Sequence, residues 1–144
     1  MLRQSSQKKE KPVRAVLDTN VLISALLYGG SPREVLRLAT DGEVIGITLP
    51  ALLEELSRIL VQKFSAPSSF ARAVLVSLSD SFEIVEPKQR IHILADEPDN
   101  RVLEAGVEGR VDYIVTGDKA LLALKSYKRV RIVSIEEFRK QIEN

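Results

Sequence analysis

Residues 15–20 read AVLDTN, and the apolar stretch VLISALLY follows immediately. The segment from Val13 to Asp18 is short, apolar and rich in β-branched residues, which predicts a buried strand. A carboxylate at the end of such a strand is costly to bury without a partner. Asp18 is therefore either the N-cap of a helix predicted from about Val21 to Tyr28, or part of a polar site.

The same alternation of strand and helix continues along the chain. Four more strands are predicted at 43–48, 82–86, 112–116 and 130–134, and helices are predicted between them at about 31–40, 50–63, 67–80, 98–109 and 119–126. Short strands separated by helices indicate βαβ units, and hence a parallel sheet covered on both faces. The predicted fold class is α/β, with a central, mostly parallel sheet of five strands.

The composition limits the classes of protein that the chain can belong to. It has 144 residues, 44% of them apolar, and no cysteine, which excludes disulfides and thiolate metal sites. No apolar run approaches the ~20 residues of a membrane span. The first twelve residues carry charge with no hydrophobic segment behind them, so we expect no signal peptide and a cytoplasmic protein without membrane contact.

The charge is unevenly distributed. The net charge is +1, but residues 1–14 carry five basic residues and one acidic residue. We expect residues 1–12 to form a basic, flexible tail before a single domain at 13–144. Such a tail can contact nucleic acid phosphates or can simply be a solubilising end.

A second basic stretch, KSYKRVR at residues 125–131, precedes the last predicted strand. Basic side chains beside a tyrosine can contact RNA. An ordinary solvated loop would have the same composition. The candidate RNA contacts are Lys125, Lys128, Arg129 and Arg131.

Two acids follow predicted strands directly. In open parallel sheets, ligands bind outside the carboxyl ends of the strands, where the strand order reverses. Asp18 ends the first predicted strand, and Asp118 comes shortly after the fourth, in VTGDKALL. Asp118 can also be the N-cap of the helix that follows it, with Gly117 in the turn. The shared position nevertheless indicates that both carboxylates lie at one edge of the sheet.

Adjacent acids in LLEEL can be distinguished by helical periodicity. Leu52, Leu56 and Ile59 belong to one apolar stripe, and Glu55 borders that stripe. Glu54 points almost directly away from it and is expected to be a solvated surface acid. Glu55 can lean over the edge of the sheet.

The segment ADEPDNRVLEAG supplies the remaining candidates. Asp96 can cap the helix that follows, and an acid at Asp99 suits the positive N-terminus of that helix. Asp99 also shares a helix face with Leu103 and Gly106, which directs it inward. Four carboxylates can therefore converge on one cleft: Asp18, Glu55, Asp99 and Asp118.

Clustered carboxylates favour a bound cation. They repel and raise one another's pKa unless a cation neutralises them. Oxygen ligands alone favour Mg²⁺ or Mn²⁺ over zinc, and such an ion can activate water against a phosphodiester. The only histidine, His92, lies in the apolar run RIHIL and is expected to be packed and structural. The chain has no Gly-rich phosphate loop.

The segments VLDTNVLIS, LLEEL, DEPDNRVLEAG and YIVTGDKALL together resemble the PIN domain family, over about Val13 to Phe138. The resemblance implies a three-layer α/β/α fold and cleavage of RNA that depends on Mg²⁺ or Mn²⁺. It assigns the acidic site to Asp18, Glu55, Asp99 and Asp118. It also matches Asn20 and Thr116 to polar positions that orient the acids or water, and Asp96 can support them.

Within the family, a small chain of this kind is most similar to the VapC-like toxin ribonucleases of prokaryotic toxin–antitoxin pairs. That similarity implies an RNA substrate, a homodimer and a small antitoxin protein as partner. The basic extension at residues 1–12 departs from the shortest members.

Two other readings compete with a nuclease. Phosphatases that phosphorylate an aspartate also carry Asp at the end of the first strand, but they need a second Asp two residues later, where this chain has Asn20. The other alternative is a catalytically silent PIN module that binds RNA or protein. The presence of all four acids argues against it.

Overall fold

The computed structural model describes residues 11–143, so the predicted basic tail lies outside the described part except for Lys11 and Pro12. The elements in chain order are β2 (Val13–Leu17), α1 (Thr19–Leu27), α2 (Gly30–Thr40), β3 (Val44–Thr48), α3 (Pro50–Gln62), α4 (Ser68–Ser81), β4 (Glu83–Ile84), α5 (Glu97–Glu108), β5 (Tyr113–Val115), α6 (Lys119–Leu124), β6 (Ser126–Tyr127), β7 (Val130–Val133) and α7 (Ile135–Glu143).

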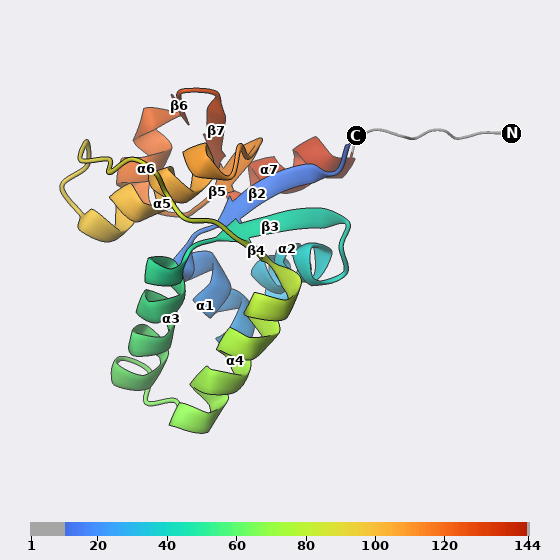
Figure 1. The fold of residues 1–144 in the computed structure, drawn as a ribbon. Coiled ribbons are helices and arrows are strands. Elements are labelled where there is room, and N and C mark those ends of the chain that lie inside the picture. Colours follow the sequence, from blue (N-terminus) through green and yellow to red (C-terminus); the bar gives the residue numbers. More distant parts are fainter. Residues whose placement is uncertain (1–10, 144) are drawn as a thin grey trace, which may run out of the picture.

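One sheet runs through the centre of the molecule in the order β4-β3-β2-β5-β7-β6 (Figure 1). Every neighbouring pair is parallel except β6 with β7, which confirms the predicted mostly parallel sheet. β6 is a sixth strand that the sequence did not indicate, because only Ser126 and Tyr127 pair across a tight turn with β7. The strand order reverses between β2 and β5, where Leu17 lies beside Val115.

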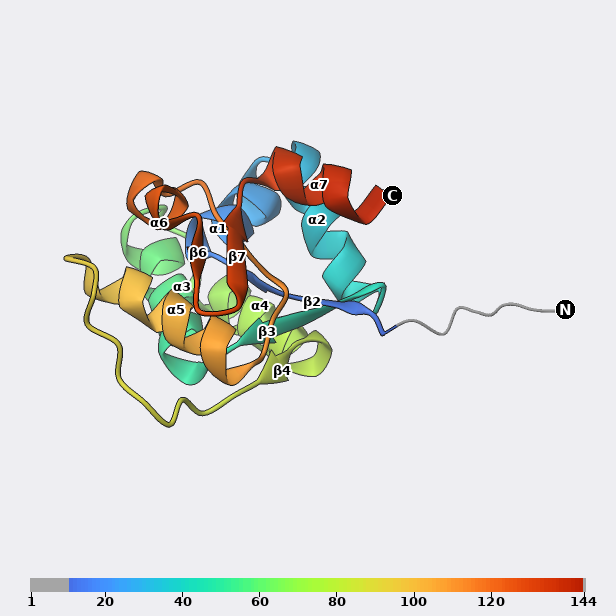
Figure 2. The ribbon, with the colours of Figure 1, turned by 90° about the horizontal axis from the view of Figure 1, so that it is seen from above.

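Helices cover both faces of the sheet and make it a three-layer α/β/α structure (Figures 1 and 2). Side chains alternate along β2: Ala15 and Leu17 enter the core beneath α1, α2, α3, α4 and α7, whereas Val16 enters the core beneath α5 and α6. The same alternation separates Ile114 from Val115 on β5. Both faces of the central strands are therefore buried, as the apolar runs in the sequence predicted.

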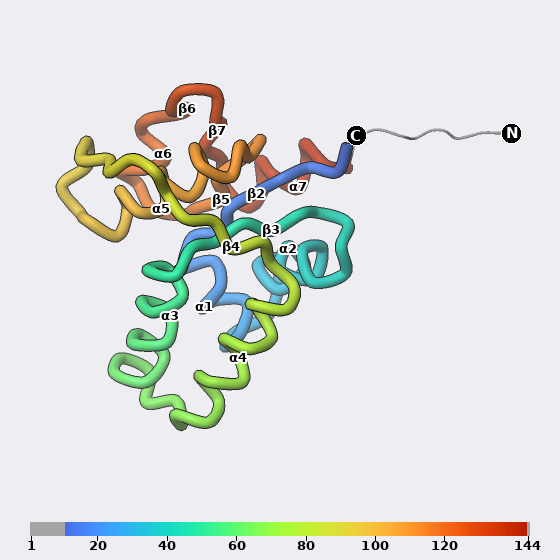
Figure 3. The backbone as a smooth tube through the Cα atoms, viewed as in Figure 1, coloured from blue at the N-terminus to red at the C-terminus, as the bar shows by residue number. Residues whose placement is uncertain are grey.

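Residues 85–96 form a long coil between β4 and α5, which we call the 85–96 segment (Figures 2 and 3). Polar side chains of α5, among them Glu104 and Asn100, attach it to that helix. The backbone N–H of Ile91 donates to Glu104 Oε2 at 2.8 Å. Asn100 Oδ1 accepts from the backbone N–H groups of Ile93 and Leu94 at 3.2 and 2.9 Å. The segment is thus fixed along α5 although it has no regular structure.

None of the helices in residues 11–143 has the length and apolar character needed to cross a membrane.

Candidate active site

Asp18 lies at the carboxyl end of β2 and is buried. Its Oδ1 accepts a hydrogen bond from the backbone N–H of Thr19 at 2.7 Å, and its Oδ2 accepts one from the Thr116 hydroxyl at 2.6 Å. Burial raises the pKa of Asp18 above its ordinary value. The two hydrogen bonds oppose that rise, and the nearby charges of Asp118 and Asp96 add to it. Asp18 is also the N-cap of α1, so capping and membership of an acidic site coexist.

Asp118 is brought to the same edge by β5. It is the N-cap of α6, where its Oδ1 accepts from the backbone N–H of Leu121 at 3.0 Å. Its own backbone N–H donates to the hydroxyl of Thr116 at 2.9 Å. Thr116 therefore connects the ends of β2 and β5 through one buried hydroxyl.

Asp99 lies in the first turn of α5 and is buried beside the strand ends. The pKa of Asp99 is raised to about 7, most of all by burial and then by the charges of Asp118, Asp96 and Asp18. A hydrogen bond with Asp118 contributes in the same direction, because it holds the proton on Asp99. The acids from three separate parts of the chain are therefore close enough to oppose one another's ionisation.

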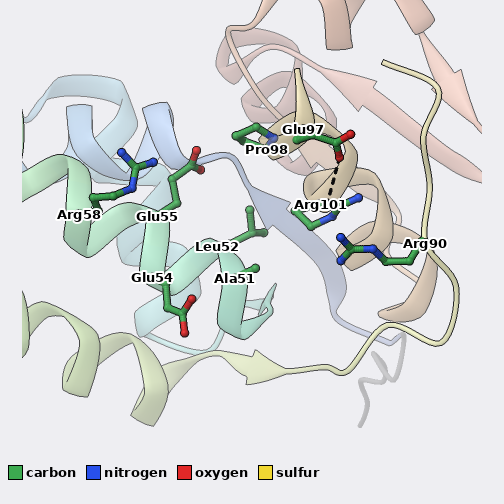
Figure 4. Close-up of a pocket in the computed structure, with 9 residues that line it drawn as sticks. All are labelled: Ala51, Leu52, Glu54, Glu55, Arg58, Arg90, Glu97, Pro98 and Arg101. Carbon is green, nitrogen blue, oxygen red and sulfur yellow. Dashed lines mark ion pairs between the residues drawn. The ribbon is translucent and has the colours of Figure 1, made fainter. Parts of the chain in front are cut away.

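Glu55 approaches from α3 and is half-buried. The hydroxyl of Thr19 donates to its Oε1 at 3.0 Å, which links it to the residue after Asp18. Burial raises the pKa of Glu55, and the charge of Asp18 adds to the rise while Arg58 opposes it. Glu54 is exposed and points away from Glu55 (Figure 4), as the helical periodicity predicted.

The donor chemistry of this cluster suits a hard divalent cation, since every candidate ligand is a carboxylate oxygen. Within residues 11–143, however, no group of three or more acidic or histidine side chains is arranged so that it could hold a metal ion as it stands. A bound ion would relieve the repulsion that raises the pKa of Asp99.

Two polar positions differ from the sequence prediction. The side chain of Asn20 is exposed and makes no hydrogen bond within the described chain, whereas the neighbouring Thr19 is buried and joins Asp18 to Glu55. Asp96 occupies the N-cap position of α5, but its side chain makes no capping hydrogen bond. Its charge instead acts on Asp18, Glu55 and Asp99.

The prediction for His92 was wrong. Its side chain is 60% exposed, and Nδ1 lies 3.5 Å from Glu97 Oε2. The run RIHIL lies in the coil of the 85–96 segment and buries Ile91 while His92 faces outward. The apolar run therefore did not mean a packed histidine here.

The basic residues of KSYKRVR lie away from the acids. Lys128 and Arg129 occupy the turn between β6 and β7, at the amino end of β7, whereas Asp18 and Asp118 follow the carboxyl ends of parallel strands. The Lys128 ammonium lies 5.7 Å from the ring centroid of Tyr127, and Arg131 lies 5.5 Å from that of Tyr113. The structure thus does not bring Lys125, Lys128, Arg129 and Arg131 into the acidic cluster.

The geometry defines an α/β/α protein with an acidic cluster at the switch point of its sheet. A family model described as "PIN domain" matches residues 14–120, and the chain belongs to that family. The predicted resemblance to the PIN domain family is therefore confirmed.

Two solved structures share the fold. One is the crystal structure of VapBC2 from Rickettsia felis bound to a DNA fragment from the VapBC2 promoter. It is similar to this chain with a TM-score of 0.60 and 12% sequence identity, and the match covers 85% of this chain and 98% of that one. The PIN domain endonuclease Utp24 is similar with a TM-score of 0.54 and 17% identity, covering 85% of each chain. A comparison with curated proteins gave no match.

Proposed function

We propose that this PIN domain protein is an endoribonuclease that depends on Mg²⁺ or Mn²⁺, with Asp18, Glu55, Asp99 and Asp118 holding the ion. The observation that supports the proposal most is the crowding around Asp99. This buried carboxyl has a pKa raised to about 7 by burial and by Asp118, Asp96 and Asp18. A cluster that resists its own ionisation is suited to a cation, which would allow all its members to be charged at neutral pH.

The residues have separable roles in this proposal. Thr116 and Thr19 hold Asp18 by both carboxylate oxygens, which fixes the plane of its carboxylate. Thr19 also orients Glu55 from the side of α3. A divalent ion bound by these acids would polarise the phosphate and lower the pKa of a water nucleophile. The hydrogen bonds from the threonines would keep the carboxylates oriented toward the substrate without a rearrangement during the reaction.

We further propose that the protein is the toxin of a toxin–antitoxin pair, acting in the cytoplasm as a homodimer and neutralised by a small antitoxin protein. The resemblance of its motifs to VapC-like toxins and its shared fold with VapBC2 support this role. Co-purification with the product of an adjacent reading frame, and recovery of nuclease activity when that product is removed, would be the expected results. Unchanged activity in the presence of that product would contradict the toxin role.

A catalytically silent PIN module that binds RNA or protein is the second candidate. It is favoured by one observation, namely that no three of the acidic side chains in residues 11–143 form a metal site as they stand. The two candidates differ in whether the acids must bind an ion and whether RNA is cut.

The test uses purified protein free of chelator and partner, with total cellular RNA as substrate. We expect cleavage with added Mg²⁺ or Mn²⁺, no cleavage with EDTA, and inactive but RNA-binding Asp18→Asn, Asp99→Asn and Asp118→Asn variants. Asp80→Asn is the matched control, because Asp80 is an exposed acid of α4. Cleavage that persists in EDTA would refute the metal-dependent reaction. RNA binding without any cleavage would favour the silent module.

A second readout does not depend on activity. Mg²⁺ or Mn²⁺ should raise the melting temperature of the wild-type protein, because a ligand that binds only the folded state stabilises it. Asp18→Asn should lose most of that increase, and Asp80→Asn should retain it. An undiminished increase in Asp18→Asn would remove Asp18 from the proposed ion site.

A further inference from the structure

A cavity of about 420 Å³ lies beside Glu55, between α3 and α5 (Figure 4). α3 contributes Glu55 and Arg58, the 85–96 segment contributes Arg90, and α5 contributes Pro98 and Arg101. One of the proposed ion ligands, Glu55, therefore lies in the wall of the cavity. Three of its lining residues are arginines, and three are glutamates, namely Glu54, Glu55 and Glu97.

The three arginines differ in how their charge is used. Arg101 is neutralised, because it lies 3.2 Å from Glu97 and 2.8 Å from the buried Glu104. Arg58 and Arg90 are exposed and make neither an ion pair nor a hydrogen bond within the described chain. Their donors are therefore available to a ligand in the cavity.

Arg90 projects from a fixed point of the backbone. The next residue, Ile91, is buried, and its N–H donates to Glu104 Oε2 at 2.8 Å while its C=O accepts from Arg101 at 3.1 Å. The coil at this point is thus attached to α5 through both the N–H and the C=O of Ile91. A ligand that binds Arg90 orders one side chain and not a whole loop, which lowers the entropic cost of binding.

Arg58 lies on the same face of α3 as Glu55, three residues later. Its charge lowers the pKa of Glu55 against the larger effect of burial, so the guanidinium acts on that carboxylate. Figure 4 shows the guanidinium of Arg58 next to the Glu55 carboxylate, with Arg90 on the opposite side of the cavity. Arg58 and Arg90 therefore flank the cavity, and Arg58 lies on the side of the acidic cluster.

We propose that Arg58 and Arg90 form a phosphate-binding subsite for a single-stranded RNA that runs from the acidic cluster into this cavity. The subsite rests on the proposed function, since it positions a phosphate next to the one that is cut. The planar fork of a guanidinium matches phosphate oxygens in two-point contacts. Pro98, in the wall of the cavity, offers an apolar surface to the intervening sugar or base.

The test measures binding of a fluorescein-labelled, mixed-sequence single-stranded RNA in EDTA, by fluorescence anisotropy over a series of KCl concentrations. We expect Arg58→Gln and Arg90→Gln each to weaken binding by about three- to tenfold at low salt. Each should also reduce the slope of log Kd against log salt by about 0.7, the value for one lost phosphate contact on a single strand. Arg72→Gln, an exposed arginine of α4, is the matched control and should leave both quantities unchanged.

Kinetics provide a second readout with added Mg²⁺. Arg90→Gln should raise KM for RNA cleavage by about the same factor with little change in kcat. The reason is that Arg90 contacts a part of the RNA that does not include the reacting phosphate. Wild-type affinity and salt slope in both variants would overturn the subsite, while cleavage by the wild-type protein would still support the nuclease. If the wild-type protein neither binds nor cuts RNA, the proposed function and the subsite both fail.

A protein partner is the competing occupant, and a polyglutamate peptide is the probe for it. If both variants bind RNA normally but lose affinity for this peptide, the cavity accepts carboxylates and the RNA subsite is wrong. Each variant should melt within about 2 °C of the wild-type protein. The reason is that Arg58 and Arg90 are exposed and make no ion pair or hydrogen bond within the described chain.

Discussion

The hydroxyl of Thr116 donates a 2.6 Å hydrogen bond to Oδ2 of Asp18, a residue 98 positions earlier in the chain. The same hydroxyl oxygen accepts the backbone N–H of Asp118 at 2.9 Å. One buried side chain thus fixes the relative position of two acids that follow different strands. The register of β2 and β5, with Leu17 beside Val115, places the three residues together.

Thr116→Val should therefore disturb the acidic cluster and not only the core. Loss of the hydrogen bond to a buried carboxylate should destabilise the protein by about 1–2 kcal/mol, or about 3–8 °C in Tm. Cleavage should fall by about 10- to 100-fold, the usual effect of removing a group that orients a ligand. Thr48→Val is the matched control, because Thr48 is also buried at a strand end but makes no side-chain hydrogen bond within the described chain. Equal effects of the two substitutions would contradict a specific role of Thr116.

Asp99→Asn should stabilise the protein when no divalent ion is present. The pKa of Asp99 is about 7 in the folded protein and near 3.8 when unfolded, so stability falls as the pH rises from about 4 through 7. At pH 8 the wild-type protein bears the full cost of ionising this carboxyl, and the amide does not. A single pKa unit is about 1.4 kcal/mol, so an increase in Tm of at least about 3 °C is expected.

The pH profile separates this effect from a general change in packing. The difference in Tm between Asp99→Asn and wild type should shrink as the pH is lowered from 8 to 5, because Asp99 becomes protonated in the folded state. Thermal melts in EDTA at several pH values measure it. Asp80→Asn, at an exposed position of α4, should show no such difference. A destabilised Asp99→Asn protein at pH 8 would show that the crowding around Asp99 is not costly.

Much of the fold could be predicted because its strands and helices carry clear apolar patterns. Residues 15–17 and 46–48 are buried, and short, mostly apolar runs of this kind are typical of central parallel strands. β6 could not be predicted, since a two-residue strand has no periodicity to detect. The course of the 85–96 segment depends on hydrogen bonds to Glu104 and Asn100, which lie at least six residues further along the chain.

The site was predictable where topology alone determines it. Parallel strands place the residues after β2 and β5 at one edge, so Asp18 and Asp118 had to be neighbours if the strands paired. Asn20 was assigned through the resemblance of its motif to the PIN family, and nothing in the sequence pattern singled out Thr19. The structure begins α1 at Thr19, earlier than the expected start near Val21. That earlier start directs Thr19 to Glu55 and leaves Asn20 exposed.

Glu55→Gln and Glu54→Gln should differ strongly in activity although the two residues are adjacent. Glu55 is half-buried and hydrogen-bonded to Thr19, while Glu54 is exposed and points away from it (Figure 4). Loss of the Glu55 charge should reduce cleavage of total RNA by about two orders of magnitude or more. Glu54→Gln should retain nearly all of it, and serves as the control for the loss of a charge on α3. Equal activities would mean that α3 presents a different face to the acidic cluster.

Glu104→Gln should loosen the 85–96 segment, whereas Glu108→Gln should not. Both glutamates lie on α5 and accept a backbone N–H of that segment, Glu104 from Ile91 at 2.8 Å and Glu108 from Lys88 at 3.1 Å. Glu104 is buried and paired with Arg101, while the hydrogen bond of Glu108 is exposed to solvent. Loss of the buried carboxylate leaves Arg101 with only the exposed Glu97 as its ionic partner, so Glu104→Gln should cost about 2–3 kcal/mol. Glu108→Gln should change stability by less than about 0.5 kcal/mol.

Hydrogen exchange identifies where the loosening occurs. The amide of Ile91 should exchange faster in Glu104→Gln than in wild type by more than global destabilisation explains, because its hydrogen-bond acceptor has weakened. The hydrogen-exchange rates of amides in β2 and β5 should change only in proportion to the change in global stability. If Arg90 depends on this attachment, Glu104→Gln should also weaken RNA binding, and Glu108→Gln should leave it unchanged. Faster exchange at Ile91 with unaltered RNA affinity would show that the position of Arg90 does not depend on Glu104.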